Sequence, residues 1–133
     1  MKYILLMQFA MAAWKEGNIG NWASEDIQAN VDYLRRFNKD LVESGEFVVT
    51  EGLGGPEGLR VVRAGDGGTP IVSDGPFPES KEFLAGYYIV DVESAERAYA
   101  LAARLSAMPG QGGVPSNIPI EVRAVMGIRS ADW

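Results

Sequence analysis

The sequence of 133 residues contains no cysteine and no histidine. Without cysteine there can be no disulfide bond, no thiol nucleophile and no thiolate metal site. Without histidine the chain lacks the side chain most used for acid–base catalysis near neutral pH, which is also the commonest zinc ligand. A metal site would have to consist of carboxylates and carbonyls, and no EF-hand spacing, P-loop or dinucleotide-binding glycine pattern is present. We therefore expect neither a metal ion nor another cofactor.

Basic residues and long apolar runs are also scarce. Twelve Lys and Arg stand against 18 Asp and Glu, and the densest basic pair, Arg35-Arg36, lies in a predicted helix. Nucleic-acid binding draws on clustered basic residues, so it is not expected here. The apolar run from Tyr3 to Met7 is too short for a signal peptide, and no later run approaches the length of a membrane span, about 20 residues. These absences predict a cytoplasmic protein that binds neither nucleic acid nor a membrane.

Hydrophobic residues make up 47% of the chain, enough for one globular domain over residues 1–133. Their spacing predicts strands at 2–9, 46–53, 84–92 and 118–125, and a hairpin formed by 59–63 and 70–73. Two helices are expected to begin at the N-caps Ser24 and Ser94, and the first to end at Gly45. The second helix should bury Ala95, Ala98, Tyr99, Ala102 and Leu105. Segments 10–23 and 108–117 are rich in glycine with asparagine or proline, and are predicted to be loops.

This order of elements predicts an α+β fold, a ferredoxin-like βαβ-βαβ arrangement with an inserted β-hairpin. Both helices should cover one face of an antiparallel sheet. The other face, with Ile4, Leu6 and Ile89, has little polar surface and must be covered as well. Trp14 and Trp22 would be costly if exposed on a loop, so we expect them to form a lid or to pack at an interface.

The most unusual segment is 72–83, VSDGPFPESKEF, in which Asp74-Gly75-Pro76 is a strong turn signal. This segment resembles the signature of the DGPF proteins, a branch of the YCII-related family, which more often has alanine and threonine at the positions of Pro78 and Ser80. The opening KYILL, the GYYIVDV at 86–92 and the IEVR at 120–123 match further blocks in the family order. The resemblance thus spans nearly the whole chain.

The resemblance implies a quaternary structure and a partner. YCII-related proteins pair their sheets in a dimeric α+β barrel, which implies a homodimer and an enclosed cavity. DGPF-type domains occur with extracytoplasmic-function sigma factors, which implies a sigma-factor partner. The histidine–aspartate pair of related proteins cannot be carried over, because this chain has no histidine.

The candidate site residues are those that match the family's motif. They are the tentative catalytic residues Asp74 and Glu82 and the ligand-binding or motif residues Gly75, Pro76, Phe77, Glu79, Lys81, Tyr87, Glu121 and Arg123. If partly buried, Asp74 can act as a base or orient a substrate; alternatively it only caps its turn. The aromatic rings of Phe77 and Tyr87 are expected in the core or a cavity wall.

The charged motif residues also allow two interpretations. Glu79, Lys81 and Glu82 can supply a general acid, a cation for an anionic substrate and a second carboxylate. They can equally form a salt-bridge ladder with Glu121 and Arg123, which share one face of their strand. Two functions follow: a homodimeric module that binds a small ligand or has a regulatory role, or, as the alternative, a small-molecule enzyme of isomerase, lyase or dehalogenating type that uses carboxylate acid–base chemistry in the barrel cavity.

Overall fold

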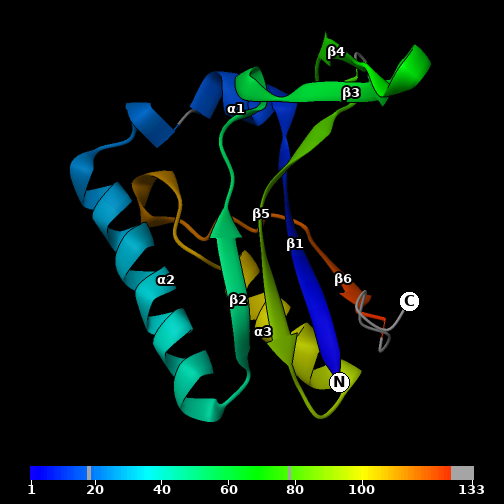
Figure 1. Ribbon diagram of the computed structural model, residues 1–133. Helices are drawn as coiled ribbons and strands as arrows, with labels where there is room; N and C mark the ends of the chain where they lie inside the picture. The colour runs from blue at the N-terminus through cyan, green and yellow to red at the C-terminus, as the bar shows by residue number, and fades with distance from the viewer. Residues whose placement is uncertain (18, 78, 127–133) are drawn as a thin grey trace.

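The computed structural model describes residues 1–17, 19–77 and 79–126 and contains a four-stranded antiparallel sheet (Figure 1). Its strands, in the order β2-β5-β1-β6, are β2 (Phe47–Gly52), β5 (Glu82–Asp91), β1 (Lys2–Ala10) and β6 (Ile120–Ala124). The long helices α2 (Ser24–Ser44) and α3 (Ala95–Ser106) make the two crossovers. The mixed α+β architecture is confirmed and is compatible with a ferredoxin-like fold. The sheet is open and does not close into a barrel within the described chain.

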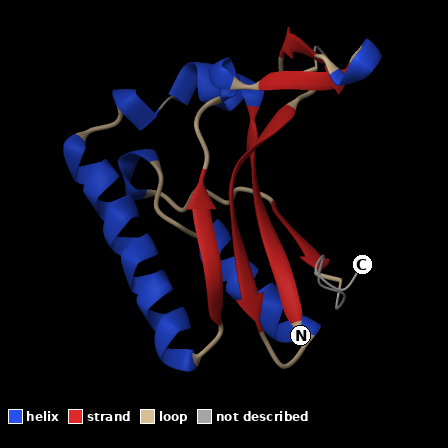
Figure 2. Ribbon diagram, viewed as in Figure 1, coloured by secondary structure: helices blue, strands red, loops and turns tan. Residues whose placement is uncertain are grey.

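Both long helices contribute to one core on the same face of the sheet (Figure 2). The apolar spacing of α2 buries Phe37 and Leu41 completely or nearly so. As predicted, α2 ends at Gly45, whose positive φ of 77° lets its N–H donate to carbonyls of the last turn. As predicted too, the Ser94 hydroxyl caps α3 by accepting a hydrogen bond from the Arg97 N–H, at 3.2 Å.

Three local predictions are wrong. Segment 10–23, predicted as a loop, contains helix α1 (Met11–Gly17) and the 3-10 helix η1 (Ile19–Asn21), because MAAWKE consists of good helix formers and the glycine ends the helix without preventing it. Ser24 is the first residue of α2; the N-cap is Ala23, which has no capping side chain. Tyr99 is 56% exposed, and the buried face of α3 uses Leu101 in its place.

The predicted hairpin is confirmed as β3 (Arg60–Ala64) and β4 (Pro70–Asp74), which form a separate two-stranded sheet. Figure 1 shows it projecting beyond the end of the main sheet, past α1. Short 3-10 helices, η2 (Pro56–Gly58) and η3 (Asp66–Gly68), lie before it and at its tip, and a fourth, η4 (Gln111–Gly113), follows α3. An isolated hairpin is at best marginally stable, so this one depends on contacts at its base.

The sheet face opposite the helices carries two rows of side chains. Across one row the paired residues are Val49, Ile89, Ile4 and Arg123, and across the next they are Glu51, Tyr87, Leu6 and Glu121. Residues opposite one another in antiparallel strands share a face. The centre of this open face is therefore apolar, and charged residues lie on its outer strands.

Candidate functional site

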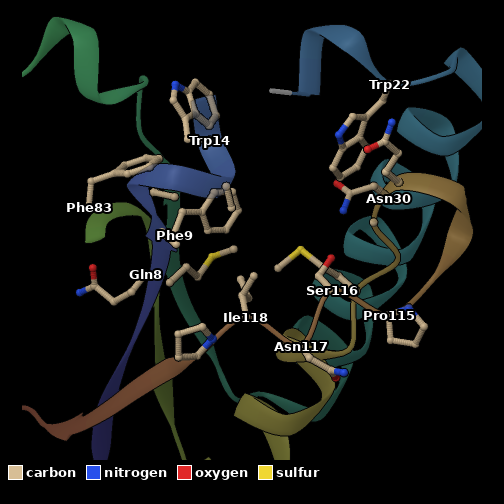
Figure 3. A pocket seen from close by; sticks show the side chains of 18 of the residues that line it. Gln8, Phe9, Trp14, Trp22, Asn30, Phe83, Pro115, Ser116, Asn117 and Ile118 are labelled. Atoms are coloured by element: carbon tan, nitrogen blue, oxygen red, sulfur yellow. The ribbon is translucent and has the colours of Figure 1, made fainter. Parts of the chain in front are cut away.

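A pocket of about 710 Å³ lies on the helix side of the sheet, where β1 and β5 meet α1. Its other boundaries are the start of α2 and the loop between α3 and β6 (Figure 3). Leu34, Met108 and Ile118 are among its lining residues, and the same side chains belong to the core or pack against it. The pocket is thus an extension of the hydrophobic core toward the surface, and its volume lies within the usual range for ligand sites.

Three aromatic rings form the wall above β1 and β5. The Phe83 ring centroid lies 5.9 Å from that of Phe9 and 5.4 Å from that of Trp14, and both pairs are close to perpendicular, at 73° and 77°. Such edge-to-face contacts fix ring positions in addition to burying area. Phe83 is 5% exposed, so the wall is anchored in the folded chain.

The facing wall combines Trp22 with polar residues (Figure 3). The side-chain amide N–H of Asn30 donates to the Pro109 carbonyl at 2.9 Å, which ties α2 to the loop after α3. The backbone N–H of Ser116 donates to the Met108 carbonyl at 2.8 Å and closes that loop. These bonds hold the polar side of the pocket in place before any ligand arrives.

None of the described residues that line this pocket is charged. The side-chain amide of Gln8, which also borders it, donates to the Glu121 carboxylate at 2.9 Å. The groups with perturbed pKa values lie elsewhere: hydrogen bonds from Arg97 hold the pKa of Glu46 below its usual value, and burial raises the pKa of Tyr88. The described chain also offers no cluster of acidic residues that could hold a metal ion.

Comparison with known proteins gives the family. The YCII-related domain matches residues 1–120. The chain belongs to the YCII-related family. An uncharacterized protein of Rhizobium meliloti (strain 1021) is 31% identical over 108 residues, which cover 80% of this chain and 86% of the relative. The resemblance seen in the sequence is therefore confirmed for the family, while membership of its DGPF branch stays a prediction.

In this YCII-related domain the signature turn lies outside the larger pocket. Asp74 ends β4 with a side chain that is 93% exposed, and its carboxylate lies 3.4 Å from Nε of Arg60. Phe77 is 46% exposed, with the Arg63 guanidinium 5.8 Å from its ring centroid. The predicted burial of Phe77 is therefore wrong within one chain, because the turn lies at the base of the projecting hairpin and not under the sheet.

Gly75 and Pro76 of the signature line a second, smaller pocket of about 380 Å³. Trp14 belongs to both pockets, and Lys15 and Glu57 line the smaller one. A Cβ on Gly75 would lie within 2.1 Å of the Leu59 side chain, so only glycine fits this turn without displacing that side chain. The signature turn thus lines the smaller pocket, which shares Trp14 with the larger one.

The predicted salt-bridge ladder is wrong. No ion pair joins Glu79, Lys81 or Glu82 to Glu121 or Arg123 among the residues that the structure describes. Glu82 pairs with Ala10 at the end of β1, whereas Glu121 pairs with Leu6. Arg123, the possible cation partner of Glu82, pairs with Ile4, six residues of β1 away from Ala10. Six residues of strand span roughly 20 Å, too far for an ion pair.

The remaining predicted residues lie on two surfaces. Glu79, Lys81 and Glu82 are exposed near the signature turn, and the Lys81 carbonyl accepts the Met11 N–H at 2.8 Å. Tyr87, already placed on the open face with Glu121 and Arg123, is half-buried, so it is not a core residue of one chain.

Sequence reasoning pointed to Trp14 and Trp22 but missed most of the larger pocket. Phe9, Asn30, Phe83 and Ser116 come from four separate parts of the chain, and none of them was among the candidate site residues. The available signal was the pair of tryptophans in a polar segment. This pair indicated that the tryptophans cover an apolar surface, but it did not indicate which other residues form that surface.

Proposed function

We propose that this YCII-related domain binds a small organic molecule in the larger pocket. The observation that carries the proposal is a concave site of about 710 Å³ built on the core, with an aromatic wall on one side and a few fixed polar groups on the other. Ligand sites are mostly apolar cavities of a few hundred Å³ with a small number of placed polar groups. The ordered hydrogen bonds around Asn30 and Ser116 mean that little has to rearrange on binding.

The alternative, a carboxylate-based enzyme, has less support. A general acid or base must come within hydrogen-bond reach of the reacting group. The described lining of the larger pocket contains no Asp or Glu, and Asp74 is exposed at the end of the hairpin strand β4. We therefore favour a binding or regulatory module over a catalyst.

A screen with a pocket-blocking variant tests this function. Ala13 is an exposed position of α1 that borders the pocket, and the neighbouring exposed Ala12 does not. We expect ligand-observed NMR with a fragment library of neutral, anionic and cationic compounds to find binders of the wild type. These should bind Ala12→Trp equally well and lose most of their affinity for Ala13→Trp. Absence of any binder sensitive to Ala13→Trp would contradict the proposal.

We also infer that the open sheet face is the interface of a homodimer. Its apolar centre, with Ile4, Leu6 and Ile89, lies between charged residues on the outer strands, Glu121 and Arg123 on one and Glu51 on the other. A two-fold interface requires a self-complementary surface, and a patch with an apolar centre and both charge signs at its margins suits one. Pairing of these faces would produce the dimeric barrel that the resemblance implied.

The sigma-factor partner remains a prediction from the resemblance alone. The acidic balance of the chain, −6 at neutral pH, favours a basic protein surface over nucleic acid as the partner. Co-purification with an extracytoplasmic-function sigma factor, reversed at high salt, is the expected result.

A further inference from the structure

We propose that the ligand of the larger pocket is neutral and aromatic. This inference rests on the proposed binding function and adds the chemical class of the ligand. It follows from three features of the pocket: the absence of charge on its described lining, the orientation of its rings and the way in which the amide of Asn30 is held.

The first feature is electrostatic. A charged group that leaves water without a partner pays a large desolvation penalty. No Asp, Glu, Lys or Arg is among the described lining residues. The adjacent charges, Lys15 and Glu57, line the smaller pocket, and the indole of Trp14 is the wall that the two pockets share. An anionic or cationic ligand would therefore lose hydration without gaining an ion pair.

The second feature is the arrangement of the aromatic side chains. Phe9 and Trp14 both stand nearly perpendicular to Phe83, so ring faces and ring edges are exposed to the same space. Trp22 lies on the facing wall (Figure 3). Aromatic pairs favour offset-stacked and edge-to-face geometries, and a planar ligand between these walls can make both. A flexible aliphatic ligand would fill the volume without these contacts.

The third feature is the amide of Asn30. One of its two N–H groups donates to the Pro109 carbonyl at 2.9 Å, and this bond fixes the orientation of the side chain. Figure 3 shows the amide on the side of Trp22, directed toward the pocket. Its oxygen can then accept a hydrogen bond from a ligand N–H or O–H. The site thus suits a neutral aromatic molecule that carries one donor.

Two fluorescent probes with the same skeleton test the inference. N-phenyl-1-naphthylamine is neutral and carries one N–H, and 8-anilino-1-naphthalenesulfonate differs from it by a single sulfonate. We expect the wild type to bind the neutral probe at least about tenfold more tightly, since a difference of about 1.4 kcal/mol is tenfold in affinity and an unpaired buried sulfonate should cost more. Each probe is also titrated against the pocket-blocking variant Ala13→Trp, and a loss of affinity for this variant shows that the probe occupies the pocket.

A charge-introduction variant provides the matched control. Ala13→Lys places an ammonium at the pocket, whereas Ala12→Lys adds the same charge on the same helix away from it. We expect only Ala13→Lys to raise the affinity for the sulfonate, by about tenfold or more, with the neutral probe still bound.

The outcomes separate the two proposals. Equal or tighter binding of the sulfonate to the wild-type pocket would overturn the neutral ligand class and leave the binding function intact. Failure of both probes, together with a fragment screen that yields no binder of any charge class, would overturn the binding function and this inference with it.

Discussion

Phe37 and Phe77 occupy opposite environments. Phe37 is fully buried, with its ring 5.3 Å from that of Tyr88 at 77°, whereas Phe77 is 46% exposed beside the hairpin. We expect Phe37→Ala to lower the free energy of unfolding by about 3–5 kcal/mol, because it leaves a cavity. Phe77→Ala should lower it by about 1 kcal/mol or less. Urea titration measures both, and a loss above about 3 kcal/mol for Phe77→Ala would mean that a second chain or the folded turn buries its ring.

Glu46 and Arg97 form the best-aligned ion pair in the described chain. Arg97 donates from Nε and Nη2 to the two carboxylate oxygens, at 2.9 and 2.8 Å. These hydrogen bonds hold the pKa of Glu46 below its usual value. A carboxyl group with a lowered folded-state pKa stabilises the protein above its unfolded pKa, about 4.3, and the contribution is lost as the pH falls through the folded value.

We therefore expect a pH-dependent effect of Glu46→Gln. At pH 7 the variant should lose about 1 kcal/mol of unfolding free energy, a figure reduced for the partial exposure of Arg97. The difference from wild type should shrink as the pH approaches 3. Glu43→Gln is the matched control, since its exposed pair with Lys39 is 3.9 Å apart. Equal losses at pH 7 and pH 3 would show that the charge of the Glu46–Arg97 pair does not contribute to the stability of the protein.

At the scale of elements, two glycines face each other where β2 pairs with β5. Gly86 and Gly52 are directly opposite one another. A Cβ on Gly86 would lie 2.8 Å from the Glu51 carbonyl oxygen, whereas a Cβ on Gly52 would meet nothing within 4 Å. The two strands can only keep this spacing if residue 86 has no side chain.

Alanine substitutions at these two glycines should therefore differ. Gly86→Ala is expected to cost about 1–3 kcal/mol, because a backbone carbonyl must move. Gly52→Ala should be neutral or slightly stabilising, because alanine restricts the unfolded chain. Thermal unfolding monitored by circular dichroism compares them, and equal effects would show that β2 shifts freely against β5.

At the scale of the whole molecule, the open sheet face predicts a homodimer. We expect light scattering at micromolar concentration to give twice the mass of one chain. Ile89→Lys places a charge in the apolar centre of this face and should give a monomer. Val42→Lys is the control, because Val42 is 61% exposed on α2. A wild-type monomer at this concentration, or a dimer that persists in Ile89→Lys, would contradict the proposed interface.

The arrangement of the whole molecule also explains why the sequence predicted the elements but not the pocket. The two long helices, the strands and the hairpin were predictable because each is decided by local spacing and by residues such as Gly45 and Ser94. The pocket was not, because Phe9, Asn30 and Phe83 are distant in sequence and meet only after the sheet forms. The signature at 72–83 attracted attention for its density of charge, yet its turn lies against the smaller pocket.

The sequence by itself determined the order of the strands and the two long helices, the family and the absence of cysteine and histidine chemistry. These are properties of residue type and local spacing, which need no knowledge of long-range contacts. Only the tertiary structure decided that Asp74 is exposed, that the ladder to Arg123 does not form and that the larger pocket is lined by uncharged residues. The reason is strand register: it sets which side chains meet, and no residue carries that information alone.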